Sequence, residues 1–498
     1  MTEPHCVDVN SHHKSLSSTA LTAMTYVKIK ILNIFFAVLF LCMSGVPGVC
    51  FPDEVQQPLA IVNASIIDRT GTQPIREGIL VIHGRTITAV GEKAEVQVPV
   101  HARIIDARGK WIIPGLIDAH VHFFQSGGLF TRPDVIDLRS RVSYKDELRW
   151  NRDRLEYTFS RYLCSGVTAV FDTGGSNWVF EVRKKAQESD LAPRVAVTGP
   201  LITTYRSLLA ELPDSPIALV NSPPEGRRTV QRIMKHRPDL IKVWFIQERG
   251  TRLQDQLEVY RAVIEESHDH GVRVIAHARE LETARAVVEA GADILAHSVS
   301  DKPVDRRFID LLKRRGVIYI TTLMVSEGYE EVLIGRPQLT ETERACADPA
   351  VVSSWEQLQS PYSHLEGQFE RTEKPIVFEN LMALYRAGVV VAAGSDAGNI
   401  GSPHGPSLHR ELELMAEAGL TPMEIIVAAT RNAALALSSH PDFGTVEEGM
   451  RADLVVLSRN PLLDLGNLGR MEAVVVDGRY IPHQKLTSMK SPPPLRIR

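Results

Sequence analysis

Eight short apolar runs, separated by longer amphipathic stretches, constrain the fold of this chain more than any other feature. Short runs that are almost entirely apolar are typical of parallel strands buried on both faces. The amphipathic stretches between most of them have helical periodicity. Eight strand and helix alternations predict an α/β fold, a closed (β/α)8 barrel of the TIM type. The runs are residues 115–121, 167–171, 194–198, 240–245, 272–277, 294–298, 317–321 and 389–396.

Short alternating strands on both sides of the barrel segment predict a smaller second domain. They lie in residues 51–112 and 439–486, and Gly, Asp and Pro residues punctuate them. Either segment alone has too few strands to bury the face of a sheet. We therefore expect the two segments to pair into one composite β-sandwich beside a barrel of residues 113–438, with residues 487–498 as a tail.

The N-terminal segment has the order of a secretory signal peptide. Lys28 and Lys30 precede the apolar run 31–43, and small and turn residues follow in 44–48. We expect residues 1–50 to be a leader, with Met24 as an alternative start, and the protein to be exported to the periplasm or secreted. The apolar run is shorter than the roughly 20 residues of a membrane span. An uncleaved membrane anchor within residues 31–50 is the alternative.

The five cysteines do not suggest a disulfide framework. Cys6, Cys42 and Cys50 fall in or beside the leader, which leaves Cys164 and Cys346 far apart in the remaining chain. We expect these two to be ordinary helix or loop residues, without a disulfide and without a structural zinc module.

The charge balance excludes one class of partner. The formal net charge is −4 and both signs are mixed along the chain, so there is no basic surface of the kind that binds nucleic acid. The expected partner is a small-molecule substrate, and membrane contact is expected only through an uncleaved leader. The sequence leaves homo-oligomerisation open.

Six polar side chains interrupt the apolar runs, at or near the end of each run concerned. In a barrel of this type the C-terminal ends of the strands meet at one mouth, where active sites lie. Residues two apart on a strand point to the same side, so the first two of the six can address one metal together. The six are His120, His122, Lys242, His277, His297 and Asp396.

The types of these residues suit a pair of divalent cations. Neutral imidazole and carboxylate bind zinc well, and two metals about 3.5–4 Å apart can share a hydroxide formed from water. The ammonium group of Lys242 is a poor neighbour for two cations, which together with burial would lower its pKa strongly. Its free amine could then react with CO₂ to give a carbamate. The sequence therefore predicts two Zn²⁺ ions and a carboxylated Lys242.

Several segments resemble the amidohydrolase superfamily of metal-dependent hydrolases. The resemblance spans roughly residues 57–485, and it is closest to the imidazolonepropionase-like and Xaa-Pro-dipeptidase-like branch, whose fourth strand carries a carboxylated lysine. The segments that carry it are 114–122 (PGLIDAHVH), 239–243 (DLIKV), 394–398 (GSDAG) and 444–457 with Asn460-Pro461.

The resemblance implies a role for each of the six residues. The first pair of histidines and Asp396 would hold the more buried metal, His277 and His297 would hold the second, and carboxylated Lys242 would bridge them. Asp396 would also accept a proton from the bridging hydroxide and deliver it to the leaving amine.

The segments expected to approach the substrate depart from the family pattern. Val-Trp-Phe-Ile-Gln-Glu-Arg follows Lys242, where the family is small and Gly-rich, and the loop 199–206 lacks a Gly/His-rich stretch. Tyr205 and Arg206 are candidates to contact a substrate carbonyl or carboxylate. His404, which follows the eighth run, is a further candidate behind the ligands, whereas His409 is expected to be solvated.

Three functions from different classes fit this sequence. The leading one is hydrolysis of an amide C–N bond in an N-acyl amino acid, a dipeptide or a cyclic amide. A lactonase or phosphotriesterase is the alternative enzyme, because the same binuclear centre attacks esters. A non-catalytic exported binding protein on this scaffold is the third. A parallel screen of amides, lactones and organophosphates would separate them.

Overall fold

The computed structural model describes residues 57–68, 73–248 and 250–495. The predicted leader, residues 1–50, lies outside these ranges. Among the described helices, none is both long enough and apolar enough to span a bilayer.

Eight parallel strands occupy the eight predicted apolar runs. They form two hydrogen-bonded ladders, one of β6, β7 and β8 and one that runs from β11 to β15. Two further short strands, β9 (Leu201–Thr203) and β10 (Ile217–Leu219), extend the second ladder beyond β11. The eight are β6 (Leu116–Val121), β7 (Val167–Asp172), β8 (Arg194–Val197), β11 (Ile241–Trp244), β12 (Val274–His277), β13 (Ile294–Ala296), β14 (Ile318–Ile320) and β15 (Val390–Ala392).

Backbone hydrogen bonds and a shared core connect the two ladders. Between β6 and the end of β15, the N–H of Ala119 donates to the carbonyl of Ala393 at 3.1 Å. On the other side, the N–H of Asp239 donates to the carbonyl of Val197 at 2.9 Å. One buried cluster takes side chains from every strand position, as the interior of a barrel requires. These observations support the predicted barrel; the cluster includes Ile117, Phe171, Ala196, Leu240, Ile275, Ile294, Ile318 and Ala392.

The helices between the strands follow from amphipathic sequence and local caps. In α8, the Asp305 side chain caps the first turn by accepting from the N–H of Phe308, and Gly316 ends the helix at a φ of 63°. Phe308, Leu311 and Leu312 form its buried stripe. The barrel helices are α2 (Tyr144–Asp153), α3 (Leu155–Cys164), α4 (Val179–Glu188), α5 (Pro223–Met234), α6 (Leu253–Asp269), α7 (Leu281–Glu289), α8 (Arg306–Arg315), α12 (Lys374–Arg386), α13 (Ser407–Ala418), α14 (Pro422–Val427) and α15 (Ala433–Leu437).

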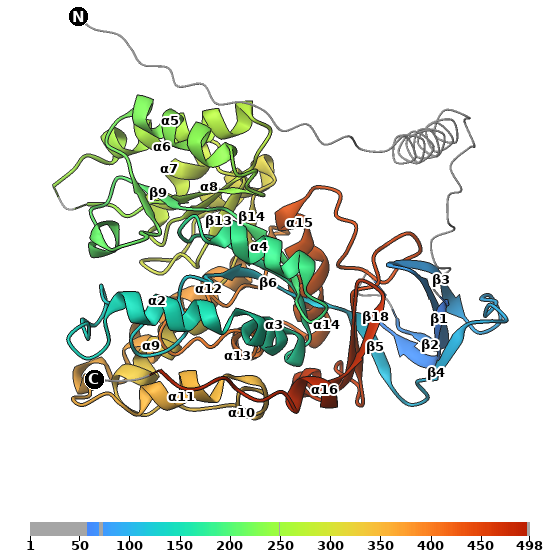
Figure 1. The fold of residues 1–498 in the computed structure, drawn as a ribbon. Helices are drawn as coiled ribbons and strands as arrows, with labels where there is room; N and C mark the ends of the chain where they lie inside the picture. The colour runs from blue at the N-terminus through green and yellow to red at the C-terminus, as the bar shows by residue number, and fades with distance from the viewer. Residues whose placement is uncertain (1–56, 69–72, 249, 496–498) are drawn as a thin grey trace, which may run out of the picture. The chain divides into compact units, whose positions relative to one another are not determined.

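The two flanking segments pair into one β domain. Figure 1 shows β1 to β5 gathered beside β18, and antiparallel pairing of β5 with β16 joins the two ends of the chain. The strands form one continuous sheet, which buries Ile61, Leu80 and Leu454 in a common core. They are β1 (Leu59–Ile66), β2 (Ile75–His83), β3 (Thr86–Glu92), β4 (Arg103–Asp106), β5 (Trp111–Pro114), β16 (Leu454–Leu457), β17 (Met471–Val476) and β18 (Arg479–Pro482).

A helical insertion separates β14 from β15. Its α10 begins with a capping box, in which Thr340 and Glu343 each bind the backbone N–H of the other. The helix α11 begins with a side-chain cap from Asp348 and with Pro349 in its first turn, and both features are common at helix N-termini. The elements are α9 (Met324–Leu333), α10 (Glu341–Cys346), α11 (Pro349–Trp355) and the short helices η2 (Ser363–Leu365) and η3 (Phe369–Glu373).

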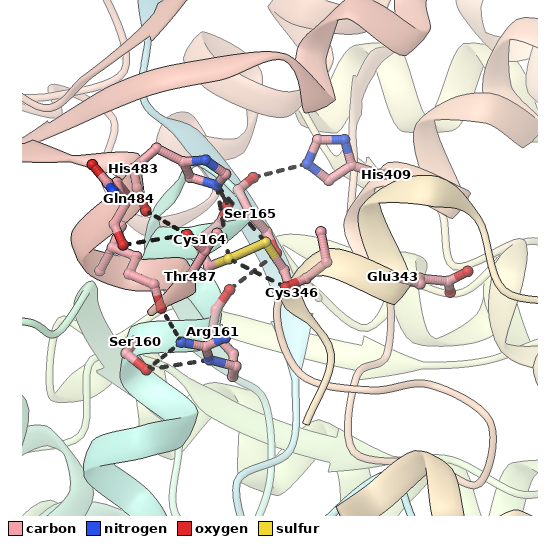
Figure 2. Close-up of a disulfide and its surroundings, with 12 residues drawn as sticks. Ser160, Arg161, Cys164, Ser165, Glu343, Cys346, His409, His483, Gln484 and Thr487 are labelled. Atoms are coloured by element: carbon pink, nitrogen blue, oxygen red, sulfur yellow. Dashed lines mark hydrogen bonds between the residues drawn. A yellow bond between two sulfur atoms is a disulfide. The ribbon is translucent and has the colours of Figure 1, made fainter. Parts of the chain in front are cut away.

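A disulfide joins this insertion to the barrel (Figure 2). Cys164 ends α3 and Cys346 ends α10, and their Cα atoms lie 5.6 Å apart although 182 residues separate them in the sequence. The prediction that both are ordinary cysteines is wrong, because no local pattern reports a contact between helices so distant in sequence. His409, predicted to be solvated, is buried next to them and donates from Nε2 to the carbonyl of Ser165 at 2.8 Å.

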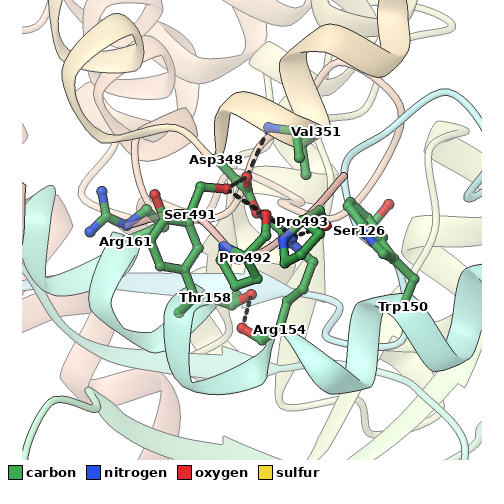
Figure 3. Close-up of polar contacts among 12 residues, drawn as sticks. Ser126, Trp150, Arg154, Thr158, Arg161, Asp348, Val351, Ser491, Pro492 and Pro493 are labelled. Atoms are coloured by element: carbon green, nitrogen blue, oxygen red, sulfur yellow. Dashed lines mark hydrogen bonds and ion pairs between the residues drawn. The ribbon is translucent and has the colours of Figure 1, made fainter. Parts of the chain in front are cut away.

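The C-terminal tail and α16 (His483–Thr487) fasten the same two regions a second time (Figure 3). Arg154, directly before α3, forms a buried ion pair with Asp348 of the insertion. Its guanidinium also donates to the carbonyls of Pro492 and Pro493, each at 2.8 Å. Ser491 donates from its hydroxyl to Asp348 at 3.1 Å. The insertion is thus fixed to α3 on both sides of Ala347.

Candidate active site

Three of the predicted ligand side chains meet around a fourth, Asp396, at the C-terminal ends of the barrel strands. Oδ1 of Asp396 lies 3.1 Å from Nε2 of His122 and 3.6 Å from Nε2 of His120. Its other oxygen lies 3.8 Å from Nδ1 of His297. All four residues are at least nine-tenths buried.

The remaining two candidates complete the same group. The rings of His277 and His297 have centroids 4.2 Å apart. Lys242, which is 1% exposed, lines one cavity of about 230 Å³ together with these two histidines, His122 and Asp396. Five strands thus deliver six polar side chains to one end of the barrel.

Two of these side chains are positioned by a left-handed backbone conformation of their own residues. His297 follows β13 with a φ of 74°, and Asp396 follows β15 with a φ of 56°. Such a conformation costs non-glycine residues about 1–3 kcal/mol and is concentrated at functional sites. Gly394, between β15 and Asp396, has a related role: a Cβ there would lie 2.8 Å from the Cβ of His120, so only glycine lets the two strands approach this closely.

A backbone carbonyl holds the ring of His122, and a buried carboxylate holds the backbone beside it. The ring of His122 donates from Nδ1 to the carbonyl of Gly174 at 2.7 Å, which leaves Nε2 free to act as a ligand. Asp172 accepts the N–H groups of Phe123 and Gly174, at 2.8 and 3.1 Å. Burial raises the pKa of Asp172 to about 6.

Burial also sets the charge states within the group. It lowers the pKa of His120, His277 and His297 well below the usual value for histidine, and the nearby Lys242 and other cationic groups add to this effect. Burial lowers the pKa of Lys242 to about 7. At neutral pH the imidazoles are therefore neutral electron-pair donors.

The group also leaves polar atoms without partners, which tests whether it fits a metal. Within the described residues, both ring nitrogens of His120, Nζ of Lys242 and Oδ1 of Asp396 are buried and have no hydrogen-bond partner. Native proteins rarely leave buried polar atoms in this state. Donor atoms of His120, His297 and Asp396 also lie within 4.8 Å of one another. The donor set fits a divalent cation.

Two arginines that the sequence analysis did not single out line the cavity. Arg132 follows the β6 loop and is fully engaged, since it binds Asp134 through Nε and Nη2 and Tyr329 and Asn399 through Nη1. Arg279 lies two residues after His277. No periodicity marks either residue, because both are on loops.

The insertion and the ends of the barrel strands supply the rest of the cavity wall. Ser326, Tyr329 and Glu373 bring polar groups to it from α9 and η3. Most of the other lining residues are apolar, and they come from the insertion, the strand ends and neighbouring loops and helices: Phe124, Val135, Leu201, Leu209, Ile217, Trp244, Leu323, Val325, Phe369 and Val377.

The three predicted substrate residues lie around this cavity rather than in its lining. Tyr205 is half-buried and packs edge-on against Trp244, which does line the cavity. Arg206 is exposed, and its backbone N–H donates to Glu248. His404 is buried and stacks on Phe123, and both of its ring nitrogens are hydrogen-bonded, to Tyr162 and to the carbonyl of Gln125.

The barrel thus brings neutral histidines, a buried lysine and an aspartate to one cavity, in an arrangement that can hold a divalent metal. The chain belongs to the amidohydrolase family, whose sequence model matches residues 111–481. This membership confirms the predicted superfamily and enzyme class, a hydrolase of amide-type carbon–nitrogen bonds.

Individual relatives are similar along most of the chain. Ochratoxinase from Aspergillus niger is 26% identical over 439 residues, which cover 82% of each chain. Imidazolonepropionase from Geobacillus sp. (strain WCH70) is 24% identical over 448 residues, covering 82% of this chain and 90% of the relative. The crystal structure of a Xaa-Pro dipeptidase with bound methionine superposes with a TM-score of 0.66 at 23% identity and covers 86% and 100% of the two chains. The similarity to this crystal structure supports the predicted barrel fold.

Proposed function

We propose that the protein is a binuclear metal-dependent amidohydrolase that cleaves the amide bond of a small N-acyl amino acid, dipeptide or cyclic amide. The single observation that carries this proposal is the buried group of six side chains with unpartnered donor atoms around Asp396. The relatives add support, since an ochratoxinase, an imidazolonepropionase and a dipeptidase are among them.

Two zinc ions are the proposed cofactors. His120, His122 and Asp396 would hold one of them, His277 and His297 the other, and a carbamate formed on Lys242 would be shared. Zinc supplies Lewis acidity, which makes water a nucleophile at neutral pH and polarises the scissile carbonyl. The buried Nζ of Lys242 has no partner among the described residues, which supports a modification that gives it acceptor oxygens.

The chain's own residues would organise the remaining steps. The cavity is lined mostly by apolar side chains, which exclude bulk water and strengthen every electrostatic interaction inside it. Asp396 is held by the hydrogen bond from its own N–H to the carbonyl of His120, at 2.8 Å. Its carboxylate would take a proton from the attacking water and return it to the leaving nitrogen.

We also propose that the protein is exported, to the periplasm or the exterior, with residues 31–50 as a membrane anchor if the leader is retained. Disulfides persist in oxidising compartments and are rare in the cytosol. The bond between Cys164 and Cys346 supports this location.

The test combines metal analysis with a substrate panel. Purified protein loaded with Zn²⁺ should hold about two ions per chain and should hydrolyse amides in a panel that also contains lactones and organophosphates. His120→Ala should lose both metal and turnover. His440→Ala is the matched control, because His440 is exposed and lies outside the group. A clear preference for esters, or a metal-free protein with unchanged turnover, would contradict the proposal.

A further inference from the structure

We propose that Arg279 and Glu373 form the subsite that selects a substrate with a free carboxylate, so that the preferred substrate is an N-acyl amino acid with an apolar side chain. This inference rests on the proposed function and names the substrate class within it. Its basis is an ion pair inside the cavity wall that the hydrolytic group does not use.

Arg279 lies where it can reach a substrate held at the strand ends. It comes two residues after His277, and both side chains line the same cavity. Its backbone is fixed, because its carbonyl accepts the N–H of Ser300 at 2.9 Å. In an N-acyl amino acid the carboxylate is three bonds from the scissile carbonyl carbon. A carboxylate bound to Arg279 therefore places that carbon near His277 and its neighbours.

The two cavity arginines differ in how fully they are engaged. Arg132 already binds a bidentate carboxylate and two further oxygens, as described above. Arg279 donates from Nη2 to Glu373 at 2.6 Å, and its side chain is about one-third exposed. A guanidinium presents five donors and binds carboxylates through two of them at once. Arg279 therefore has donors to offer an incoming anion.

Glu373 has a second hydrogen-bond partner, which can hold it after a substrate carboxylate has replaced it at Arg279. The hydroxyl of Ser326 donates to the same oxygen of Glu373 at 2.8 Å. Partly exposed ion pairs contribute little net stability, so replacing Glu373 by a substrate carboxylate costs little. Glu373 remains hydrogen-bonded to Ser326 when Arg279 turns to the substrate.

The surroundings of the pair specify the rest of the substrate. Trp244, Val325, Phe369 and Val377 line the same cavity and offer apolar surface. An apolar acyl group or amino-acid side chain buries area against them, whereas a second charged group would be desolvated without a partner. The combination fits an amide that carries one carboxylate and otherwise apolar groups.

The experiment compares two substrates that differ only in the carboxylate. N-benzoyl-leucine and N-(3-methylbutyl)benzamide share the acyl group, the scissile amide and the branched chain, and each yields benzoate and an amine. Wild-type zinc-loaded protein should prefer the acid. Arg279→Met should lower the ratio of the two kcat/KM values about 10- to 100-fold, mainly through KM of the acid, because a charge-assisted hydrogen bond is lost. Glu373→Gln should lower KM of the acid, since the competing internal anion is removed.

Arg285→Met is the matched control. Arg285 also pairs with a carboxylate, Asp305 at 2.7 Å, but it lies on α7 and outside the cavity lining. It should leave both substrates unaffected. An equal loss for both substrates in Arg279→Met, or an unchanged ratio, would overturn the inference.

A binding measurement separates failure of this inference from failure of the proposed function. Calorimetric titration of N-benzoyl-leucine into the protein needs no turnover. Weaker binding in Arg279→Met supports the subsite even if neither amide is hydrolysed, in which case the proposed function fails alone. Equal binding by wild type and Arg279→Met overturns the subsite whatever the turnover.

Discussion

The floor and the wall of the cavity are built in different ways. The floor consists of side chains at the ends of barrel strands, and the backbone of those strands fixes them: Asp396 binds the carbonyl of His120, and His122 binds that of Gly174. The wall comes partly from the insertion between β14 and β15 and partly from loops that follow the strands. Side chains hold the insertion, through the Cys164–Cys346 disulfide and the Arg154–Asp348 pair.

This difference assigns the chemistry to the floor of the cavity and substrate selectivity to its wall. A change in the floor displaces ligand atoms directly, so it should affect turnover on every substrate. A change in the attachments of the wall acts at a distance from the reacting atoms, so it should affect stability first and turnover less. The following predictions test this comparison, in order of the expected effect on turnover.

Lys242→Met should have the largest effect. It removes the proposed shared ligand from the floor, and loss of a ligand should exceed the roughly 10- to 100-fold that loss of a residue behind a ligand costs. We expect kcat/KM to fall more than about 100-fold, with partial recovery when a short carboxylic acid is added. Steady-state kinetics and metal analysis check this. Lys302→Met, at a half-exposed site, should match wild type. Undiminished turnover in Lys242→Met would refute a role for Lys242 in the floor.

Gly394→Ala should have the next largest effect. The new methyl group would lie 2.8 Å from Cβ of His120 and 2.7 Å from Cγ2 of Ile320, so the floor must shift. We expect kcat/KM to fall about 10- to 100-fold, as for other changes that misplace a ligand. Gly466→Ala is the control, because its nearest contact is the flexible Asp464 side chain at 3.3 Å. Equal kinetics for the two variants would show that the floor tolerates displacement.

The floor is also the part of the site that the sequence reveals. The residues His120, His277 and Asp396 interrupt apolar runs at strand ends, and the rules of the barrel bring such ends together. The structure gathers all six candidates for this reason. Two details remain invisible in the sequence, however: the left-handed backbone at His297 and the closeness of Gly394 to His120.

The contacts of the wall could not be predicted, because they are long-range and involve loops. Arg279 and Glu373 are 94 residues apart and Cys164 and Cys346 are 182 apart. Hydrophobic periodicity specifies an element and its buried face, but it does not specify which side chains of an insertion contact the barrel. The prediction of unpaired cysteines failed for this reason.

Arg154→Met should affect stability far more than turnover. It leaves Asp348 buried without its cation, and breaking a buried pair costs about 3–5 kcal/mol. We expect the free energy of unfolding in urea to fall by about this amount, and residues 488–495 to become accessible to limited proteolysis. Turnover should fall less than tenfold, about the lower limit expected for Gly394→Ala. Arg227→Met, in an exposed pair with Glu265, should change stability by less than about 1 kcal/mol. If Arg154→Met lost more turnover than Gly394→Ala, the distinction between the floor and the wall would be contradicted.

Glu147→Gln should leave turnover nearly unchanged and alter the pH dependence of stability. Glu147 accepts from the hydroxyl of Ser126 at 2.5 Å, and burial raises its pKa from 4.5 to about 7. The protonated acid is favoured in the folded state, so its contribution to stability is complete below pH 4.5 and is lost as the pH rises through about 7. Glu147→Gln lacks this pH-dependent loss of stability. Relative to wild type, its free energy of unfolding should therefore increase by about 1–3 kcal/mol from pH 5 to pH 8.

Urea denaturation at both pH values measures this gain. Glu188→Gln is the control, since Glu188 is exposed on α4 and should show no difference between the two pH values. A constant difference between Glu147→Gln and wild type across this range would contradict the raised pKa of Glu147.

The Cys164–Cys346 disulfide also has a consequence for the order of events during biosynthesis. At about 5–20 residues per second, the ribosome adds Cys346 roughly 10–40 s after Cys164. Within that interval the barrel strands β7, β8 and β11 to β14 are synthesised. The native pairing therefore cannot form in a nascent chain that stops short of the insertion. A thiol-blocking reagent applied during synthesis should modify Cys164 in products that end before Cys346, so the oxidised Cys164–Cys346 bond marks chains in which barrel and insertion have already met.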